Sequence, residues 1–598
     1  MSRSGSRSGS RVSRSAPAVL VAGVVLLALV AGCSGIPTSG PVRQGASVAA
    51  ERDQPNTRSI GQPPRDGMTQ QQIVEGFIFA AASFDEDHAV ARLFLTSDAA
   101  KTWNPALGAT IFDGSTGSPK LTAPGDVVFS ATRIADLSQQ GEYVSAVGTV
   151  NAEFKLRKVD GQWRITSPPP GLMLTPSDLA RAYRLYDIFF PDPARTVLVP
   201  NQVLLPVGPG ASTALVRALV AGPTPWLAPA VFTALPTGTK LVVDSAPVVD
   251  GVVQVDLTAP AATVTGREAQ ALSAQVVWTL RQLGGVTGVR ITVDGTPLRG
   301  VAAVQDIAAW PQWNPDGVLT SQSADLGALY SDKDRLLALV NGLPRSLLGQ
   351  LGDGGFPLYQ PGVSFDGTEV GALDAAAHNL YVARLGVNEK VPPAVVTGAT
   401  RLTAPTWDRF DNVWTVDDRL SGPVFWVDSL GPTAVGGAGA KRVTAADLPH
   451  GRVVAMRIAR DGARVALVVK RPSGVGADLY LGRVERGPGR LVVSGFRLVS
   501  TVLTDVADVA WLSADRLVVL GRVTPGGVRQ PLVIDLSGAT AQSLGLIDSG
   551  STNRPGLRSV TAIPGHDILA SADNGALYRY TGSGWDELGT GQFPSYAG

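Results

Sequence analysis

A repeat in the second half of the chain places the strongest constraint on its fold. Between residues 317 and 598 a short polar turn recurs every 45–54 residues or so, and an apolar, strand-forming run follows it each time. The turns are Ser364–Gly367, Arg409–Asn412, Arg460–Gly462, Ser513–Asp515 and Pro564–Asp567. A repeat of this length, with a polar turn before an apolar strand, is typical of a β-propeller blade. Residues 317–598 therefore predict an all-β propeller of about five blades, to which Leu326–Val340 could add a sixth or complete the ring. A pair of β-sandwiches is the alternative.

The chain opens with a segment that is typical of export. Arginines stand at positions 3, 7, 11 and 14, no acidic residue precedes Glu51, and an apolar run extends from Ala16 to Val30. A positive start, a short apolar run and small residues at its end are the parts of a secretory signal peptide. As a helix the run would cover about 22 Å, less than the roughly 30 Å of a bilayer core. Residues 1–32 therefore predict a cleaved signal peptide and not a permanent transmembrane helix.

Cys33, the single cysteine of the chain, follows this run directly. The junction Val30–Cys33 resembles a bacterial lipobox, which implies cleavage between Gly32 and Cys33. It also implies a diacylglycerol thioether and an N-acyl group on Cys33. Two or more acyl chains anchor a protein stably where one does not. An ordinary signal peptide with an incidental Cys33 is the alternative. We expect a lipoprotein bound to the lipid bilayer at the extracytoplasmic face of the cell membrane.

Residues 33–68 are rich in glycine, proline and polar side chains. Such a composition buries little apolar surface and stays extended, so it predicts a flexible tether. The whole chain is 44% hydrophobic and carries 51 basic against 50 acidic residues, a net charge of +1. This balance gives no electrostatic reason to expect a nucleic acid as partner.

Residues 69–168 predict helices followed by an antiparallel sheet. Ile73, Phe77 and Ala80 recur at helical spacing, and Ala89–Leu95 predicts a second short helix. Alternating runs follow at 127–132, 143–150 and 154–156, and Asp160-Gly161 predicts a tight hairpin turn. This order resembles the NTF2-like α+β cone. The charged run Asp85–His88 is interpreted as a helix start or a solvated face and not as acid–base machinery.

Residues 175–300 predict a second α+β domain. Tyr183–Val199 is extended in pattern, helices are expected from Ala211 and across Ala269–Leu280, and a hairpin is expected at Asp250-Gly251. The segment resembles the GerMN domain, named for a spore-germination lipoprotein. The matching residues are Ala218–Pro223, Leu235–Thr239, Val255–Leu257, Thr279-Leu280 and Val293–Gly295. The resemblance implies a binding or scaffolding module and brings no catalytic residues with it.

No catalytic, cofactor-binding or metal-binding set is predicted. The four histidines, His88, His378, His450 and His566, stand singly without the spacing of metal ligands, and no nucleophile or phosphate-loop motif occurs. We therefore expect a protein that is not an enzyme and holds no cofactor. Trp407, Trp414, Trp426 and Trp511 are candidates to stack on sugars, although packing between blades is the expected role of each.

Lipobox, N-terminal cone, GerMN-like domain and propeller, in this order, resemble the LpqB lipoproteins of actinobacteria. The resemblance implies an accessory role to an MtrA–MtrB type two-component system, with an influence on envelope homeostasis and cell division. In this role the lipoprotein would contact the ectodomain of the sensor histidine kinase. The residues themselves predict only a tethered, non-catalytic, multi-domain platform. A protein that binds cell-wall glycan is the alternative function, followed by a propeller hydrolase.

Overall fold

The computed structural model describes residues 61–83, 86–208, 210–317, 321–388, 390–419, 421–429, 439–487, 489–547 and 556–598. The predicted signal peptide, the cleavage and lipidation site at Gly32 and Cys33, and most of the predicted tether lie outside the described residues.

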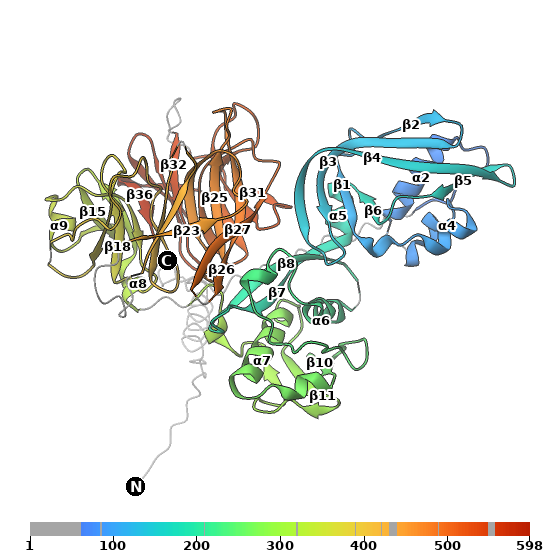
Figure 1. The fold of residues 1–598 in the computed structure, drawn as a ribbon, viewed down its shortest axis with the longest axis horizontal. Coiled ribbons are helices and arrows are strands. Elements are labelled where there is room, and N and C mark those ends of the chain that lie inside the picture. The colour runs from blue at the N-terminus through green and yellow to red at the C-terminus, as the bar shows by residue number, and fades with distance from the viewer. Residues whose placement is uncertain are drawn as a thin grey trace, which may run out of the picture. The chain divides into compact units, whose positions relative to one another are not determined.

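The first described domain has helices followed by a sheet, as the sequence predicts (Figure 1). Helix α2 begins with a capping box, because Thr69 Oγ1 accepts from the Gln72 backbone N–H while the Gln72 side chain accepts from Thr69 N–H. Its apolar face is buried against the sheet. The helices are α2 (Gln70–Ala81), η1 (Glu86–His88), α3 (Ala89–Arg92), α4 (Ser97–Thr102), η2 (Pro105–Leu107) and α5 (Pro176–Ala182).

The sheet of this domain has the order β5-β4-β3-β1-β6, with β2 paired to β3. Its strands are β1 (Ala109–Phe112), β2 (Ser118–Ala123), β3 (Asp126–Leu137), β4 (Tyr143–Val159), β5 (Gln162–Ser167) and β6 (Leu172–Leu174). Two expectations are corrected. The runs at 143–150 and 154–156 form one continuous strand, and α3 ends at Arg92 because Phe94 and Leu95 pair with Ile165 of the sheet.

The second domain joins a hairpin to a small sheet and two helices. The hairpin consists of β7 (Tyr183–Pro191) and β8 (Leu198–Pro206). Its turn forms because the buried Asp192 carboxylate accepts from the backbone N–H groups of Thr196 and Val197. The remaining elements are α6 (Ala211–Ala221), η3 (Ala228–Ala230), β9 (Val248–Val249), β10 (Val252–Leu257), η4 (Ala259–Thr263), α7 (Gly266–Leu280), β11 (Gly288–Val293), β12 (Thr296–Pro297), β13 (Gln305–Asp306) and η5 (Pro311–Trp313).

Both predicted helices and the predicted hairpin are present in this domain. The sheet order is β12-β11-β10-β9, with β13 paired to β11. Strands β10 and β11 are parallel, and α7 connects them. The face of α7 that carries Leu272 and Val276 is fully buried with Val253 and Val255 of β10. Strands β9 and β10 meet at Asp250-Gly251, whose φ angles of 50° and 77° are those of a two-residue hairpin turn.

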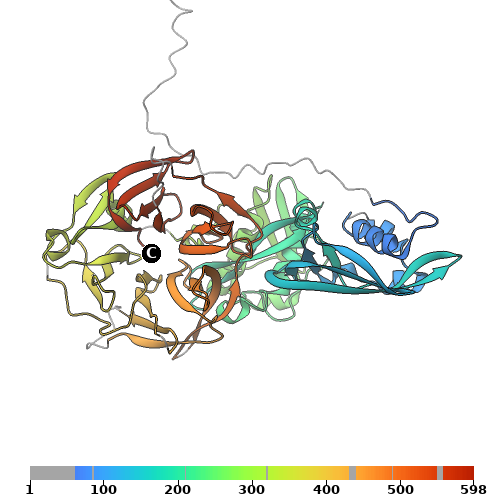
Figure 2. The same cartoon turned by 90° about the horizontal axis from the view of Figure 1, so that it is seen from above.

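The third domain is a β-propeller of six blades, seen down its axis in Figure 2. The five turns of the sequence predict about five blades, and the structure has one more. The sixth blade comes from Leu326–Val340, the segment that could add a blade or complete the ring. There β36 (Gln592–Ser595) pairs with β14 (Ala328–Asp332), so the last strand closes the blade that begins the domain. The other strands of this first blade are β15 (Arg335–Val340) and β16 (Leu343–Ser346).

The remaining five blades follow in chain order. Blade two has three strands and blades three to six have four each. Blades three and four also pair through their outer strands, β23 and β27, which are parallel. The strands are β17 (Tyr359–Val363), β18 (Glu369–Leu373) and β19 (Leu380–Arg384); β20 (Thr406–Trp407), β21 (Asn412–Asp417), β22 (Val424–Ser429) and β23 (Lys441–Ala445); β24 (Arg452–Ile458), β25 (Arg464–Lys470), β26 (Ala477–Gly487) and β27 (Arg490–Leu498); β28 (Asp505–Ser513), β29 (Arg516–Arg522), β30 (Gln530–Asp535) and β31 (Ala541–Ser543); β32 (Leu557–Thr561), β33 (Ile568–Ala572), β34 (Ala576–Tyr580) and β35 (Trp585–Thr590). Short helices α8 (Ser321–Leu326) and α9 (Gln350–Asp353) flank the first blade.

Candidate functional site: a three-domain junction and the propeller channel

Arg497 of strand β27 contacts both of the other domains. Its Nη1 donates to Glu142 Oε1 at 2.8 Å, and Glu142 belongs to the loop between β3 and β4 of the first domain. Its guanidinium carbon lies 4.0 Å from the centre of the ring of Trp226, which follows α6 in the second domain. Only 15% of the Arg497 side chain and 11% of the Glu142 side chain are exposed. One side chain of the propeller therefore joins all three domains.

The two charges of this junction are strongly desolvated. Burial raises the pKa of the Glu142 carboxyl, and the neighbouring Arg497 guanidinium opposes that rise. Burial lowers the pKa of Arg497 to about 10, and Glu142 opposes that fall. Each partner therefore compensates part of the cost of burying the other.

Further hydrogen bonds surround Arg497. Trp226 Nε1 donates to Gly495 O at 2.5 Å, and Arg483 Nη1 donates to Trp226 O at 2.8 Å. Ser145 Oγ of β4 donates to Val499 O at 3.0 Å. In the same loop as Glu142, Gly141 O accepts from the Leu204 N–H of β8 at 2.8 Å. The domains thus meet through specific backbone and side-chain contacts as well as through one ion pair.

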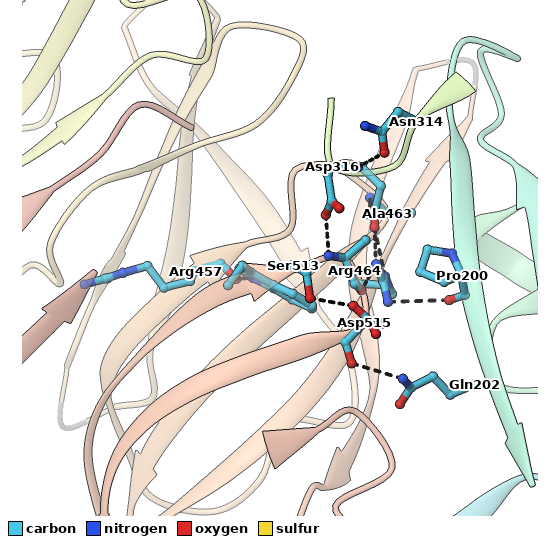
Figure 3. A network of polar contacts seen from close by, with 12 residues as sticks. Pro200, Gln202, Asn314, Asp316, Arg457, Ala463, Arg464, Ser513 and Asp515 are labelled. Carbon is cyan, nitrogen blue, oxygen red and sulfur yellow. Dashed lines mark hydrogen bonds and ion pairs between the residues drawn. The ribbon is translucent and has the colours of Figure 1, made fainter. Parts of the chain in front are cut away.

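A second cluster lies where the β7–β8 hairpin meets the turns of blades four and five (Figure 3). Arg464, 1% exposed, pairs with Asp461 and donates from Nη2 to Ala514 O at 2.6 Å and from Nη1 to Pro200 O at 3.4 Å. Gln202 Nε2 donates to Asp515 O at 3.0 Å. Beside these groups, Val199, Leu227, Ala230 and Ala463 form a buried apolar cluster across the same contact.

Two carboxyl groups at this cluster have raised pKa values. Burial, with the nearby Asp515 carboxylate, raises the pKa of Asp187 to about 8. Burial also raises the pKa of Asp316 to about 6, although Asp316 Oδ1 accepts from the Ala514 N–H at 2.5 Å. The second and third domains therefore share a buried polar contact in which some carboxyl groups hold protons above their usual range.

The propeller encloses a channel of about 410 Å³. The first strands of the blades line it, together with the residues around the β36 closure. Four arginines reach it, Arg401, Arg457, Arg460 and Arg558, along with the carboxylate of Asp508. At one end Arg460 donates to Asp316 O at 2.7 Å and to Ala597 O at 2.6 Å, and Gly598 N–H donates to Val363 O at 3.0 Å.

Three of the four candidate tryptophans pack inside the propeller. Trp407, Trp414 and Trp511 are 2%, 0% and 6% exposed, so they offer almost no ring face to a sugar. Their indole N–H groups donate to Gly362 O, Asp408 Oδ2 and Arg457 O at 2.8, 2.8 and 3.0 Å. Trp426 is half-buried, and the Arg442 guanidinium lies 5.3 Å from its ring centre.

The other residues singled out in the sequence are spread over the molecule. Glu86–His88 form the short helix η1, where the 77%-exposed Asp87 side chain pairs with Arg92 at 3.0 Å, as expected of a solvated face. His88 lies against Trp103 and His566 against Tyr596, with ring centres 5.8 and 5.5 Å apart. Within the described ranges, no group of three or more His, Cys, Asp or Glu side chains could hold a metal ion. No helix in that same part of the chain is long and apolar enough to cross a membrane.

The junction residues were not predicted from the sequence. Glu142 and Arg497 stand 355 positions apart, and Gln202 and Asp515 stand 313 apart, so no local motif contains both partners. The available signal is weaker: Arg464 and Arg497 occupy strands whose neighbouring positions are mostly apolar, and a charged residue there needs a partner from elsewhere.

Comparisons with known proteins assign the three domains to family models. Residues 63–180 match the model "Lipoprotein LpqB, N-terminal domain", residues 187–299 match "Sporulation and spore germination", and residues 334–597 match "Lipoprotein LpqB beta-propeller domain". The fold and these matches together define an actinobacterial type of lipoprotein with a GerMN domain followed by a propeller.

Full-length relatives identify the family. Lipoprotein LpqB of Streptomyces coelicolor is 30% identical over 640 residues, which covers 99% of each chain. Lipoprotein LpqB of Thermobifida fusca is 29% identical, covering 94% of this chain and 95% of its own, and that of Mycolicibacterium smegmatis is 29% identical, covering 84% and 86%. The chain belongs to the LpqB lipoprotein family, and membership implies a location at the outer face of a membrane. These relatives carry the name of a lipoprotein and not of an enzyme.

Proposed function

We propose that the chain is a membrane-anchored accessory protein that binds the ectodomain of a sensor histidine kinase of the MtrB type. Through this contact it would influence envelope homeostasis and cell division. Binding, with no reaction of its own, is the proposed activity, and the acylated Cys33 is the proposed anchor. The observation that carries the proposal is the three-domain junction around Arg497.

The junction supports recognition of a large partner for a physical reason. A protein that must order its domains when it binds loses part of the interaction energy to that ordering. Here the Glu142–Arg497 pair and the Trp226 contacts fix three domains during folding. Surfaces from all three domains are then available to one partner without a further ordering cost.

The anchor would strengthen a weak contact. Confinement to one membrane raises the effective concentration of a membrane-embedded kinase near the lipoprotein. A tether of about 35 residues spans a few tens of ångströms as a flexible coil. A modest intrinsic affinity would therefore suffice. The main support for glycan binding came from four tryptophans that could stack on sugars, and three of these four are buried.

Site-specific photo-cross-linking tests the proposal and locates the contact. A photoreactive residue is placed singly at Val147, Val243 or Val475, which are 80%, 68% and 75% exposed and lie in the first, second and third domains. In intact cells we expect a kinase adduct from at least one position and unequal yields among the three. The same probe in a Cys33→Ala background is the matched control, and its adduct yield should fall.

The following negative result would overturn the proposal. It is overturned when none of the three positions yields a kinase adduct from correctly located protein and the purified kinase ectodomain shows no binding to the full chain. Adducts with wall polymer in place of the kinase would support the glycan alternative.

A further inference from the structure

We propose that the propeller channel is a binding site for a small soluble phosphate-bearing anion, held by Arg401 and Arg558. The family comparison assigns no ligand to this domain, and the inference does not depend on the kinase contact. It rests on the channel's volume, on the charges that line it and on the strained backbone at its wall.

The channel has the size and the closure of a ligand site. Its volume of about 410 Å³ lies within the range of small-molecule pockets. Arg460, Ala597 and Gly598 follow the ends of the inner strands β24 and β36, and their hydrogen bonds lie at that end of the channel. Arg401 and Arg558 stand instead at the beginnings of inner strands, so they lie toward the opposite end.

The charges that line the channel do not cancel. Asp508 carries the one carboxylate side chain among the lining residues, and its oxygens already have partners. Oδ1 lies 3.2 Å from Arg457 Nη2, and Oδ2 accepts from the Val560 N–H at 3.0 Å. Among the residues that the structure describes, Arg558 forms an ion pair only with Asp573, at 3.2 Å and with both side chains about half exposed. The guanidinium of Arg401 makes no hydrogen bond or ion pair with any residue that the structure describes. The channel is therefore positive, and its low-dielectric walls concentrate that field.

Arginine is the side chain suited to this ligand. Its planar fork of N–H donors matches phosphate and carboxylate oxygens in pairs, with hydrogen bonds about twice as strong as neutral ones. Guanidinium groups from blades three, four and six line one cavity and outnumber its single carboxylate side chain, which favours a ligand with more than one negative charge. A phosphate dianion meets that condition, whereas a monocarboxylate does not.

The channel wall holds two strained residues. Gln360 and Phe593 both have left-handed φ angles, 53° and 52°, which residues with side chains rarely adopt. Both line the channel, and the Arg558 guanidinium lies 5.9 Å from the Phe593 ring centre. Strain of this kind persists where the surrounding structure fixes it and is concentrated at binding sites.

Titration calorimetry of the full chain in detergent with inorganic phosphate, at constant ionic strength, tests the proposal. We expect saturable binding by the unmodified chain and affinities about tenfold weaker or worse in Arg401→Gln and in Arg558→Gln, since each removes a charge-assisted hydrogen-bond donor. Arg345→Gln, which changes an exposed arginine on the outer strand β16, is the matched control and should bind as the unmodified chain does. Arg401 is exposed, so its variant is expected to fold, and its melting temperature verifies this.

Three results would overturn the proposal. One is the absence of saturable phosphate binding at concentrations up to about 10 mM, a weak millimolar affinity. Another is an equal affinity of Arg401→Gln and Arg345→Gln for phosphate. The last is binding of citrate or acetate under conditions where phosphate does not bind. Competition by sulfate, which shares the shape and charge of phosphate, would support it.

Discussion

At the scale of single residues, buried arginine decides how the domains are held together. Arg464 is buried and the Arg497 side chain is 15% exposed, and each binds groups from another domain. A buried ion pair adds little net stability over an apolar pair, but the loss of one partner leaves an uncompensated buried charge. Both arginines should therefore be far more sensitive to substitution than the surface arginines around them.

Arg497→Gln tests this directly. The substitution leaves Glu142 buried without its cation, and we expect it to destabilise the chain by about 3 kcal/mol, measured as a shift in the urea unfolding midpoint. Arg490→Gln is the matched control on the same strand, because its side chain is 69% exposed and lies 3.7 Å from Glu485. A surface pair of this kind contributes less than about 1 kcal/mol. Equal midpoint shifts in the two variants would mean that the junction is not buried in solution.

Single residues also differ in whether their roles can be predicted from the sequence around them. Asp85–His88 could be interpreted from its own neighbourhood, and the exposed Asp87–Arg92 pair agrees with that interpretation. The role of Arg497 could not be predicted in this way, because its partners Glu142 and Trp226 become its neighbours only after three domains have folded. The sequence also does not predict that the channel arginines line one cavity, since that cavity exists only once the propeller ring has closed.

At the scale of helices and strands, short-range sequence patterns predict most of the elements that the structure contains. Asp160-Gly161 and Asp250-Gly251 make the expected hairpin turns, and α2, α6 and α7 bury the faces that their spacing indicates. The errors occur where a distant partner decides. Phe94 and Leu95 leave the expected helix to pair with Ile165. The sixth blade, which the sequence left open, also depends on a distant partner, because β14 pairs with β36 from the other end of the domain.

Gly251→Val tests the hairpin of the second domain. At φ 77° a β-branched residue is strained, and its Cβ would lie 2.9 Å from Thr287 Oγ1 and 3.4 Å from Gly285 O. We expect a destabilisation of about 1 kcal/mol or more, seen as a lower melting temperature. Gly295→Val is the control, since Gly295 has the same φ of 77° but its Cβ would meet nothing within 4 Å. The difference between the two variants measures the clash apart from the strain. An unchanged melting transition for Gly251→Val would contradict the turn geometry.

At the scale of the whole molecule, the order of the domains carried more information than any single motif. The sequence indicates four segments separately: a lipobox, helices with a sheet, a GerMN-like segment and a propeller repeat. Only the order of these segments along the chain points to one family. What one sequence could not predict is the docking of these domains. The Arg464 cluster depends on turns of two different blades meeting strand β8, an arrangement that exists only in the assembled chain.

The anchor is the whole-molecule feature on which the proposed function depends most. Cys33 is the only cysteine of the chain, so its substitution removes every thiol that could be acylated. Each buried methylene contributes about 0.8 kcal/mol, and two or more acyl chains are needed for stable anchoring. We expect Cys33→Ala to abolish lipidation and the cut before residue 33, and to release any cleaved protein from the detergent phase.

Intact mass and detergent-phase partition of the mature protein measure both effects. Ser34→Ala is the matched control, because it changes the neighbouring residue and keeps the thiol. If Cys33→Ala protein still enters the detergent phase with the same acyl mass, the anchor lies elsewhere. If the variant is released but kinase cross-linking persists at full yield, confinement to the membrane contributes nothing to partner binding. The three-domain body would then have to bind the kinase by its intrinsic affinity alone, and the purified kinase ectodomain should bind the released protein as tightly as the anchored one.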